Sequence, residues 1–208
     1  MLTYTQLHLL SVNMKRRPYD GRLRREALAA EATRRILHAT VELHARRGAL
    51  GTSHAMIAKR ACVSLPTVYK YFPTRDHLIP ACTGLVLAKS PVALDPRIFE
   101  GLRSPRERIR ALAQALFRLH EYLAPWAQWS ARDAAELPAL ARFLEGAAAA
   151  RRGLIRRAVA PVSARDRLAL ADILLDWPAW RALTAVGHTS VQAAAIAAEA
   201  IVALIGKP

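Results

Sequence analysis

The sequence has few cysteines, few acidic residues and no long apolar run, and each shortage excludes a class of protein. Only Cys62 and Cys82 occur, outside any Cys-x-x-Cys pair or zinc-ligand spacing. A disulfide framework and a zinc finger are therefore not expected, and a reducing cytoplasm suits the chain. No run of about 18 apolar residues predicts a membrane-spanning helix. The segment 1–13 lacks a leading basic region, which argues against a signal peptide.

The shortage of acidic residues leaves a strong positive charge. Lysine and arginine number 31 against 16 acidic residues, so the 208-residue chain carries a formal charge of +15. The first 77 residues contain 14 of the basic residues and only 5 of the acidic ones. Such a surplus attracts polyanions, so nucleic acid or an anionic membrane surface is the expected partner of the N-terminal third.

Catalytic patterns are also missing. His120-Glu121 begins a possible metal-binding pair, but Ala124 stands where the second histidine would be needed. The sequence contains neither a Gly-x-Ser-x-Gly elbow nor a glycine loop of the kind that holds phosphate. We therefore expect no enzymatic activity, no cofactor and no resident metal.

Proline and glycine divide segments that otherwise have helical periodicity, and alternating β-branched runs are scarce, so the fold class is expected to be all-α. Gly48 is a helix stop, and Thr52 or Ser53 and then Ser64 can cap the next two helices. Pro125 is expected to end a helix, and boxes at 130–133 and 163–166 to begin others. The expected helices are 31–47, one ending near 60, one from Ser64 to about Tyr71, one from 74 to about 89, 104–123, 137–158, 164–177 and 190–205.

Three regions follow from this division. Residues 1–25 are expected to form a disordered basic tail, 26–73 a three-helix helix-turn-helix domain, and 74–208 a larger helical regulatory domain. The basic run Arg16–Arg25 suits either a solvated segment or an arm that follows DNA. Pro80, inside the helix that joins the two domains, is a candidate pivot.

The segment Thr52–Leu78, extended by Ile36–Ala39 and Arg46–Gly48, resembles the signature of TetR-family transcriptional regulators. The resemblance implies an N-terminal DNA-binding domain followed by a helical ligand-binding and dimerisation domain. It further implies a cytoplasmic homodimer that binds a palindromic operator in double-stranded DNA as a repressor and is released by a small-molecule effector. The sequence suits activation as well as repression. The alternative is a helical small-molecule-binding or peripheral membrane protein without sequence-specific DNA binding.

The resemblance also assigns DNA-binding roles to particular residues. Where the family usually has glycine in the turn, this chain has Cys62, whose side chain would cost about 1–2 kcal/mol in a left-handed turn. Hydroxyls at 52, 53 and 64 are expected at phosphates, 65–67 at base edges, and 69–71 and 75 at the DNA backbone. The assigned set is Thr52, Ser53, Ser64, Leu65, Pro66, Thr67, Tyr69, Lys70, Tyr71 and Arg75.

Aromatic residues gather in the distal part of the chain, where family members carry a ligand pocket. They suit either the lining of such a pocket or an ordinary helical core. Trp177 and Trp180 are assigned to the core or to a dimer interface. The candidate ligand-binding residues are Phe117, His120, Tyr122, Trp126, Trp129 and Phe143.

Overall fold

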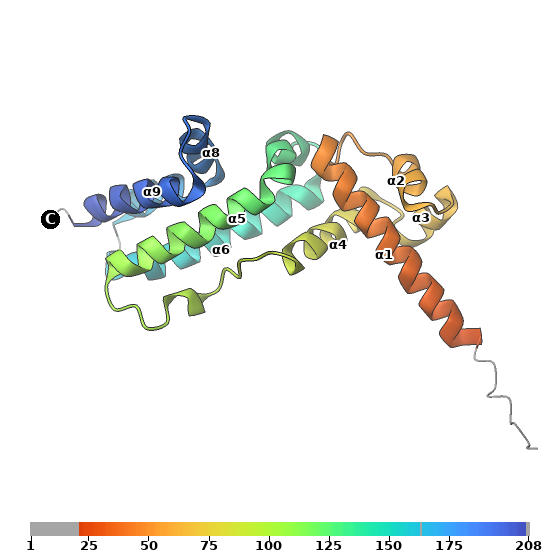
Figure 1. Ribbon diagram of the computed structural model, residues 1–208, viewed down its shortest axis with the longest axis horizontal. Helices are drawn as coiled ribbons and strands as arrows, with labels where there is room; N and C mark the ends of the chain where they lie inside the picture. Colours follow the sequence, from red (N-terminus) through yellow and green to blue (C-terminus); the bar gives the residue numbers. More distant parts are fainter. Residues whose placement is uncertain (1–20, 163, 207–208) are drawn as a thin grey trace, which may run out of the picture.

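The structure, a computed structural model, describes residues 21–162 and 164–206. All regular structure in these ranges is helical, which confirms the all-α prediction. A smaller N-terminal unit lies at one end of an elongated molecule, and the remaining helices form a bundle at the other end (Figure 1). The elements are α1 (Gly21–Arg47), α2 (His54–Ala61), α3 (Leu65–Tyr71), α4 (Arg75–Ala88), the 3-10 helix η2 (Pro96–Phe99), α5 (Pro105–Ala134), α6 (Pro138–Val159), α7 (Arg165–Leu174), α8 (Trp177–Ala185) and α9 (Ser190–Ile205).

The N-terminal unit is formed by α1, α2 and α3 around a small core. Ile36, Ile57, Val68 and Phe72 are buried in this core, together with Leu78 of α4. Each of the first three helices contributes apolar side chains from one face, so none of them can bury that face alone. The unit therefore behaves as one packed body at the end of α4.

The first helix is longer than expected and corrects the boundary of the tail. Residues 21–25, assigned to the disordered tail 1–25, form the first turns of α1. The segment is rich in Arg, Glu, Ala and Leu, which are strong helix formers, and Arg22 lies 3.8 Å from Glu26 one turn later. The rest of the expected tail, and Arg16 and Arg17 of the basic run, lie outside the described residues.

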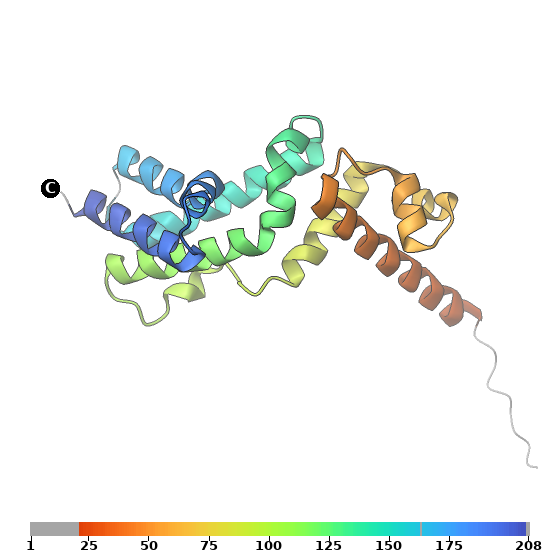
Figure 2. The same cartoon turned by 45° about the horizontal axis from the view of Figure 1, so that its top comes forward.

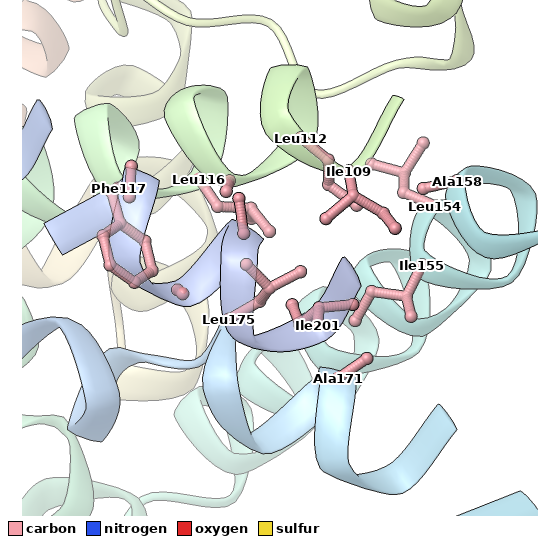
Figure 3. Close-up of a cluster of buried hydrophobic side chains, with 14 of the residues drawn as sticks. Ile109, Leu112, Leu116, Phe117, Leu154, Ile155, Ala158, Ala171, Leu175 and Ile201 are labelled. Atoms are coloured by element: carbon pink, nitrogen blue, oxygen red, sulfur yellow. The ribbon is translucent and has the colours of Figure 1, made fainter. Parts of the chain in front are cut away.

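The C-terminal bundle is built on α5. Its buried side chains Ile109, Leu112 and Leu116 meet Ile155 of α6 and Ile201 of α9 (Figure 3). The two long helices α5 and α6 run side by side, and α9 lies at the end of the molecule farthest from α2 and α3 (Figures 1 and 2). None of the described helices combines the length and the apolar character needed to cross a membrane.

Helix α5 corrects a second expectation. It continues through Pro125 to Ala134, so the helix does not end at Pro125 and no new helix begins at 130–133. An interior proline costs about 3 kcal/mol because it removes one hydrogen bond and crowds the preceding turn. Contacts made after the proline offset that cost: the indole N–H groups of Trp126 and Trp129 donate to Val41 O and Ala45 O of α1 at 2.9 and 3.1 Å.

The end of the chain is divided more finely than expected. The predicted helix 164–177 corresponds to α7, which ends at Leu174, and α8 is a further helix that the sequence did not predict. It begins at Trp177, where the Asp176 carboxylate accepts the Trp177 N–H at 2.7 Å. The expected cap at Ser163 lies outside the described residues. The capping boxes at Ser104 and at Thr189 are both present, which confirms the predicted starts of α5 and α9.

Candidate nucleic-acid interface and ligand cavities

The turn between α2 and α3 has the left-handed conformation for which glycine is best suited. Cys62 has φ 51° and ψ 49°, and the Val63 N–H donates to Ala58 O at 3.1 Å to close the helix end. The Arg35 guanidinium of α1 donates to the carbonyl oxygens of Ala61 and Cys62. Hydrogen bonds to α2 and to Arg35 of α1 therefore fix the turn, although its central residue carries a side chain.

The beginning of α3 is fixed by its cap. Ser64 Oγ accepts the Thr67 N–H at 3.2 Å and lies 2.7 Å from Thr67 Oγ1. Leu65 is 38% exposed, and Pro66 beside it is also exposed. Because the cap occupies Ser64 and Thr67 with each other, the apolar side chains of 65 and 66 are the most accessible part of this first turn.

The outer face of α3 carries an aromatic and a basic side chain. Tyr69 is 49% exposed and stacks on His54 of α2, with ring centroids 4.7 Å apart. His54 Nε2 lies 2.9 Å from Phe72 O, so the imidazole is held while it supports Tyr69. Lys70 is exposed, and its Nζ lies 5.6 Å from the centre of the Tyr71 ring.

Thr52 does not belong to this exposed face. It is 2% exposed, and its hydroxyl donates to Gly48 O at 2.8 Å, so the side chain closes the loop before α2 instead of facing a phosphate. Ser53 is exposed and caps α2 by accepting the Met56 N–H at 3.2 Å. Arg75 is half-buried and donates to Thr52 O at 3.3 Å.

The candidate ligand-binding aromatics have different positions. Phe117 is fully buried in the bundle core, and the Tyr122 hydroxyl donates to Val86 O of α4 at 2.9 Å. His120 is also buried, with its Nε2 3.1 Å from Leu175 O. Trp126 and Trp129 contact α1 as described above. Polar tips that suggest ligand binding in the sequence are thus engaged with backbone carbonyl groups.

Two of the cavities formed by the described residues lie between the helices. The larger, here called the groove, has a volume of about 1340 Å³ and lies among α5, α6, α8 and the segment 87–94. The smaller, here called the junction cavity, has a volume of about 140 Å³ and is enclosed by α1, α4, α5 and α6. Of the candidate ligand residues, His120 lines the groove, Trp126 and Trp129 line the junction cavity, Phe143 lines both, and Phe117 and Tyr122 line neither.

Burial keeps three titratable side chains of these cavities, those of His44, Cys82 and His120, uncharged. Desolvation lowers the pKa of His44, which lines the junction cavity, to about 4, although the Asp133 carboxylate opposes the shift. Burial raises the pKa of the neighbouring Cys82 thiol to about 11. Desolvation also lowers the pKa of His120 in the groove. At neutral pH, the two histidines and the thiol therefore present neutral surfaces.

Sequence reasoning missed the polar residues that fix the loop after α1. The buried Asp133 carboxylate accepts the Ala49 N–H at 2.5 Å and the Leu50 N–H at 3.3 Å. Arg132 pairs with Asp133 and donates to Arg47 O at 3.1 Å. The only sequence signal was the pattern Ser130–Asp133, which indicated a helix cap. The same carboxylate caps a distant loop instead, and only the tertiary fold brings the two together.

The geometry defines a class of protein: a helix-turn-helix unit on α1–α3, joined by α4 to a helical domain with an internal cavity. Residues 36–82 match the family described as bacterial regulatory proteins, tetR family. The match covers the C-terminal part of α1, all of α2 and α3, and the first part of α4.

Curated relatives match over part of the chain. The HTH-type transcriptional regulator LuxR of Vibrio harveyi is 33% identical over 100 residues, which are 46% of this chain and 48% of LuxR. The HTH-type transcriptional regulator BetI 1 of Chromohalobacter salexigens is 34% identical over 84 residues, 40% of this chain and 42% of that protein. The chain thus spans less than half the length of either relative.

Solved structures match over most of the fold. A crystal structure of a Streptomyces coelicolor protein described as a transcriptional regulator superposes with a TM-score of 0.62 at 22% identity, covering 85% of this chain and 99% of that one. A TetR transcription regulator from Haloarcula marismortui gives a TM-score of 0.58 at 17% identity, covering 85% and 97%. These likenesses extend the fold assignment to the C-terminal bundle.

Proposed function

We propose that this protein is a ligand-responsive DNA-binding transcriptional regulator that acts as a homodimeric repressor at a palindromic operator. The observation that carries the proposal is the exposed face of α3, where Leu65, Pro66, Tyr69 and Lys70 lie on a helix fixed by its cap and its turn. A recognition helix enters the major groove with its first turn against base edges and its polar side chains against the backbone. The match of residues 36–82 to the tetR family of bacterial regulatory proteins supports the same role.

In this arrangement, recognition of the DNA sequence relies more on the placement of α3 by backbone contacts than on base-specific hydrogen bonds. Leu65 and Pro66 offer only apolar contact, for example to a thymine methyl group, and Thr67 is engaged with Ser64. Ser53, Tyr69, Lys70, Tyr71 and Arg75 are the proposed backbone contacts. Thr52 is left out because its side chain is buried.

The homodimer is proposed from the far end of the bundle. Large apolar side chains are exposed there on α7 and α9: Ile173 is 63% exposed, Val191 66% and Ile196 42%. An apolar surface of this kind is typical of a contact with another protein. Two copies joined through it would present two recognition helices, as a two-fold operator with half-sites about 34–36 Å apart requires.

Release by an effector is proposed to use the groove. A ligand that binds better to a conformation with the wrong spacing of the two α3 helices would shift the population away from DNA. Helix α4 joins the two units, and its interior Pro80 lacks the N–H for one helical hydrogen bond, which supports its role as a pivot.

The test is a mobility-shift titration at several salt concentrations, with the neighbouring intergenic DNA and a scrambled duplex. Lys70→Ala should lower the slope of log affinity against log salt by about one unit, because one phosphate contact is lost. Lys89→Ala is the matched control, since it removes an exposed lysine at the end of α4, away from α3. Equal slopes for the two variants would place the binding face elsewhere. Equal affinity for the scrambled duplex would favour a role without sequence-specific DNA binding.

A further inference from the structure

The groove and the junction cavity share a wall. Residues of α4, α5 and α6 line both spaces, so an occupant of the groove that extends past this wall enters the space against α1. The shared residues are Leu87, Leu123, Ala127, Ser130, Phe143 and Leu144. All but Ser130 are apolar, so this boundary between the two spaces suits contact with a hydrocarbon or aromatic group.

Three arginines line the groove: Arg142, next to Phe143 in the sequence and 3.9 Å from Asp76, and farther along Arg151 and Arg181. Arg151 lines it but is paired with Asp172 at 2.8 Å and with Asp176 at 2.5 Å. Arg181 of α8 also lines it, is exposed, and has no ion-pair partner among residues 21–162 and 164–206. A guanidinium without a carboxylate partner in the lining of a mostly apolar groove favours an anionic group beside it.

The distance between the two ends sets the length of an occupant. Phe143 lies in the shared wall, and Arg151 lies eight residues later on the same helix, which corresponds to a rise of about 12 Å. Asp176, which binds Arg151, is the N-cap of α8, the helix that carries Arg181. A molecule that contacts both Arg181 and the shared wall must therefore be elongated.

We propose that the groove binds an elongated amphiphile whose anionic head pairs with Arg181 and whose apolar end occupies the junction cavity. The size of that cavity suits this end, because apolar cavities of about 150 Å³ take up benzene-sized molecules. The low pKa of His44 keeps its imidazole uncharged at neutral pH. The part of this inference that concerns control of DNA binding rests on the proposed function; the binding itself does not.

The position of the apolar end gives it access to the elements that hold the N-terminal unit. The junction cavity is lined by His44 of α1, Ile79 of α4 and Trp126 of α5. A group inserted there contacts α1 and α4 at once, whereas a molecule confined to the groove contacts only α4 and the bundle. The chain length of the amphiphile should therefore determine its effect on the N-terminal unit.

Calorimetric titration of the full chain without DNA tests the binding site. Decanoate, decanol and decyltrimethylammonium, each below its micelle-forming concentration, differ only in the head group. We expect decanoate to bind most tightly of the three. Arg181→Ala should lower the affinity for decanoate about tenfold, because one charge-assisted hydrogen bond is lost, and Arg181→Lys should restore part of that affinity. Equal binding of the three probes, or no effect of Arg181→Ala, would overturn the head-group assignment.

A second pair of variants tests the apolar end. Ala127→Phe places a larger side chain in the shared wall and should lower the affinity for decanoate about tenfold. Butyrate is too short to reach the wall, so its affinity should not change. Ala149→Phe makes the same change on an exposed position of α6 that lines neither cavity, and should alter nothing. Far-ultraviolet circular dichroism verifies that both variants fold. Indistinguishable decanoate affinities for the two variants would overturn the junction assignment.

Mobility shift with the same preparations separates this inference from the proposed function. Specific DNA binding without decanoate binding would overturn the inference alone. Decanoate binding with no preference among duplexes would support the ligand site and overturn the proposed function.

Discussion

Replacing Cys62 with glycine should stabilise the protein. Cys62 has φ 51°, a left-handed conformation that costs a residue with a Cβ about 1–2 kcal/mol. Glycine removes that strain but gains freedom in the unfolded chain, which opposes the benefit by about 0.5–1 kcal/mol. The thiol is exposed, so little packing is lost with it. The expected net gain is about 0.5–1 kcal/mol.

The turn keeps its other interactions in this variant. Arg35 binds the carbonyl oxygens of residues 61 and 62, and the N–H groups of 62 and 63 donate to carbonyls of α2. Residues 61–63 make all of these hydrogen bonds through their backbone groups, so the glycine variant retains them. The change therefore isolates the conformational term.

Urea unfolding followed by circular dichroism measures the difference, with Cys62→Ala as the control that keeps the Cβ and removes the sulfur. Alanine should lie within a few tenths of a kcal/mol of the parent, and glycine above both. For a chain of this size, a gain of 1 kcal/mol corresponds to about 2–4 °C in Tm. If glycine proved no more stable than alanine, the strain argument would be refuted, because the two variants differ only at the Cβ.

Three further predictions follow from the same structure. Gly48→Ala should cost more than about 2 kcal/mol in urea unfolding, because φ is 77° and the new Cβ would collide with the Asp133 carboxylate; an Asp133→Ala background should reduce the clash component. Ser64→Ala should cost about 1 kcal/mol through loss of the α3 cap, whereas Ser64→Asp, which can still accept the Thr67 N–H, should retain most of the stability. The free energy of unfolding should fall by about 2 kcal/mol from pH 8 to pH 5 because of His44. Its pKa is about 4 in the folded protein and 6.5 in the unfolded chain, so only the unfolded chain binds the proton as the pH drops. His44→Phe should remove this part of the pH dependence.

The sequence predicts local structure well wherever a short-range pattern determines it. Ser64 and Thr189 are caps because a hydroxyl three residues before a free N–H can satisfy it without help from the rest of the fold. Gly48 ends α1 with a positive φ for the same reason. The positions of α2 and α3 and the exposure of Tyr69 and Lys70 then follow.

Tertiary contacts overrule local patterns in α5 and in the loop before α2. Pro125 is a helix stop by local criteria, but the helix continues because residues beyond it bind α1. Asp133 fits a cap for the following segment, yet it accepts N–H groups from a loop 84 residues earlier. Thr52 is a plausible surface hydroxyl in the sequence, and it is buried because the loop folds back on Gly48. None of these partners is visible from spacing along the chain.

The contacts that explain the continuation of α5 also determine how the N-terminal unit can move. Trp126 and Trp129 donate hydrogen bonds to carbonyl groups on successive turns of α1, so they oppose both rotation and translation of α1 relative to α5. Each such hydrogen bond contributes about 1 kcal/mol net, and coupling between a ligand site and a distant site is typically 1–3 kcal/mol. The loss of one or two of these hydrogen bonds would therefore cost about as much free energy as such a coupling. An effector of the proposed kind therefore need only weaken one or two of these bonds, and the wall of the junction cavity that contains both indoles is the place from which it could do so.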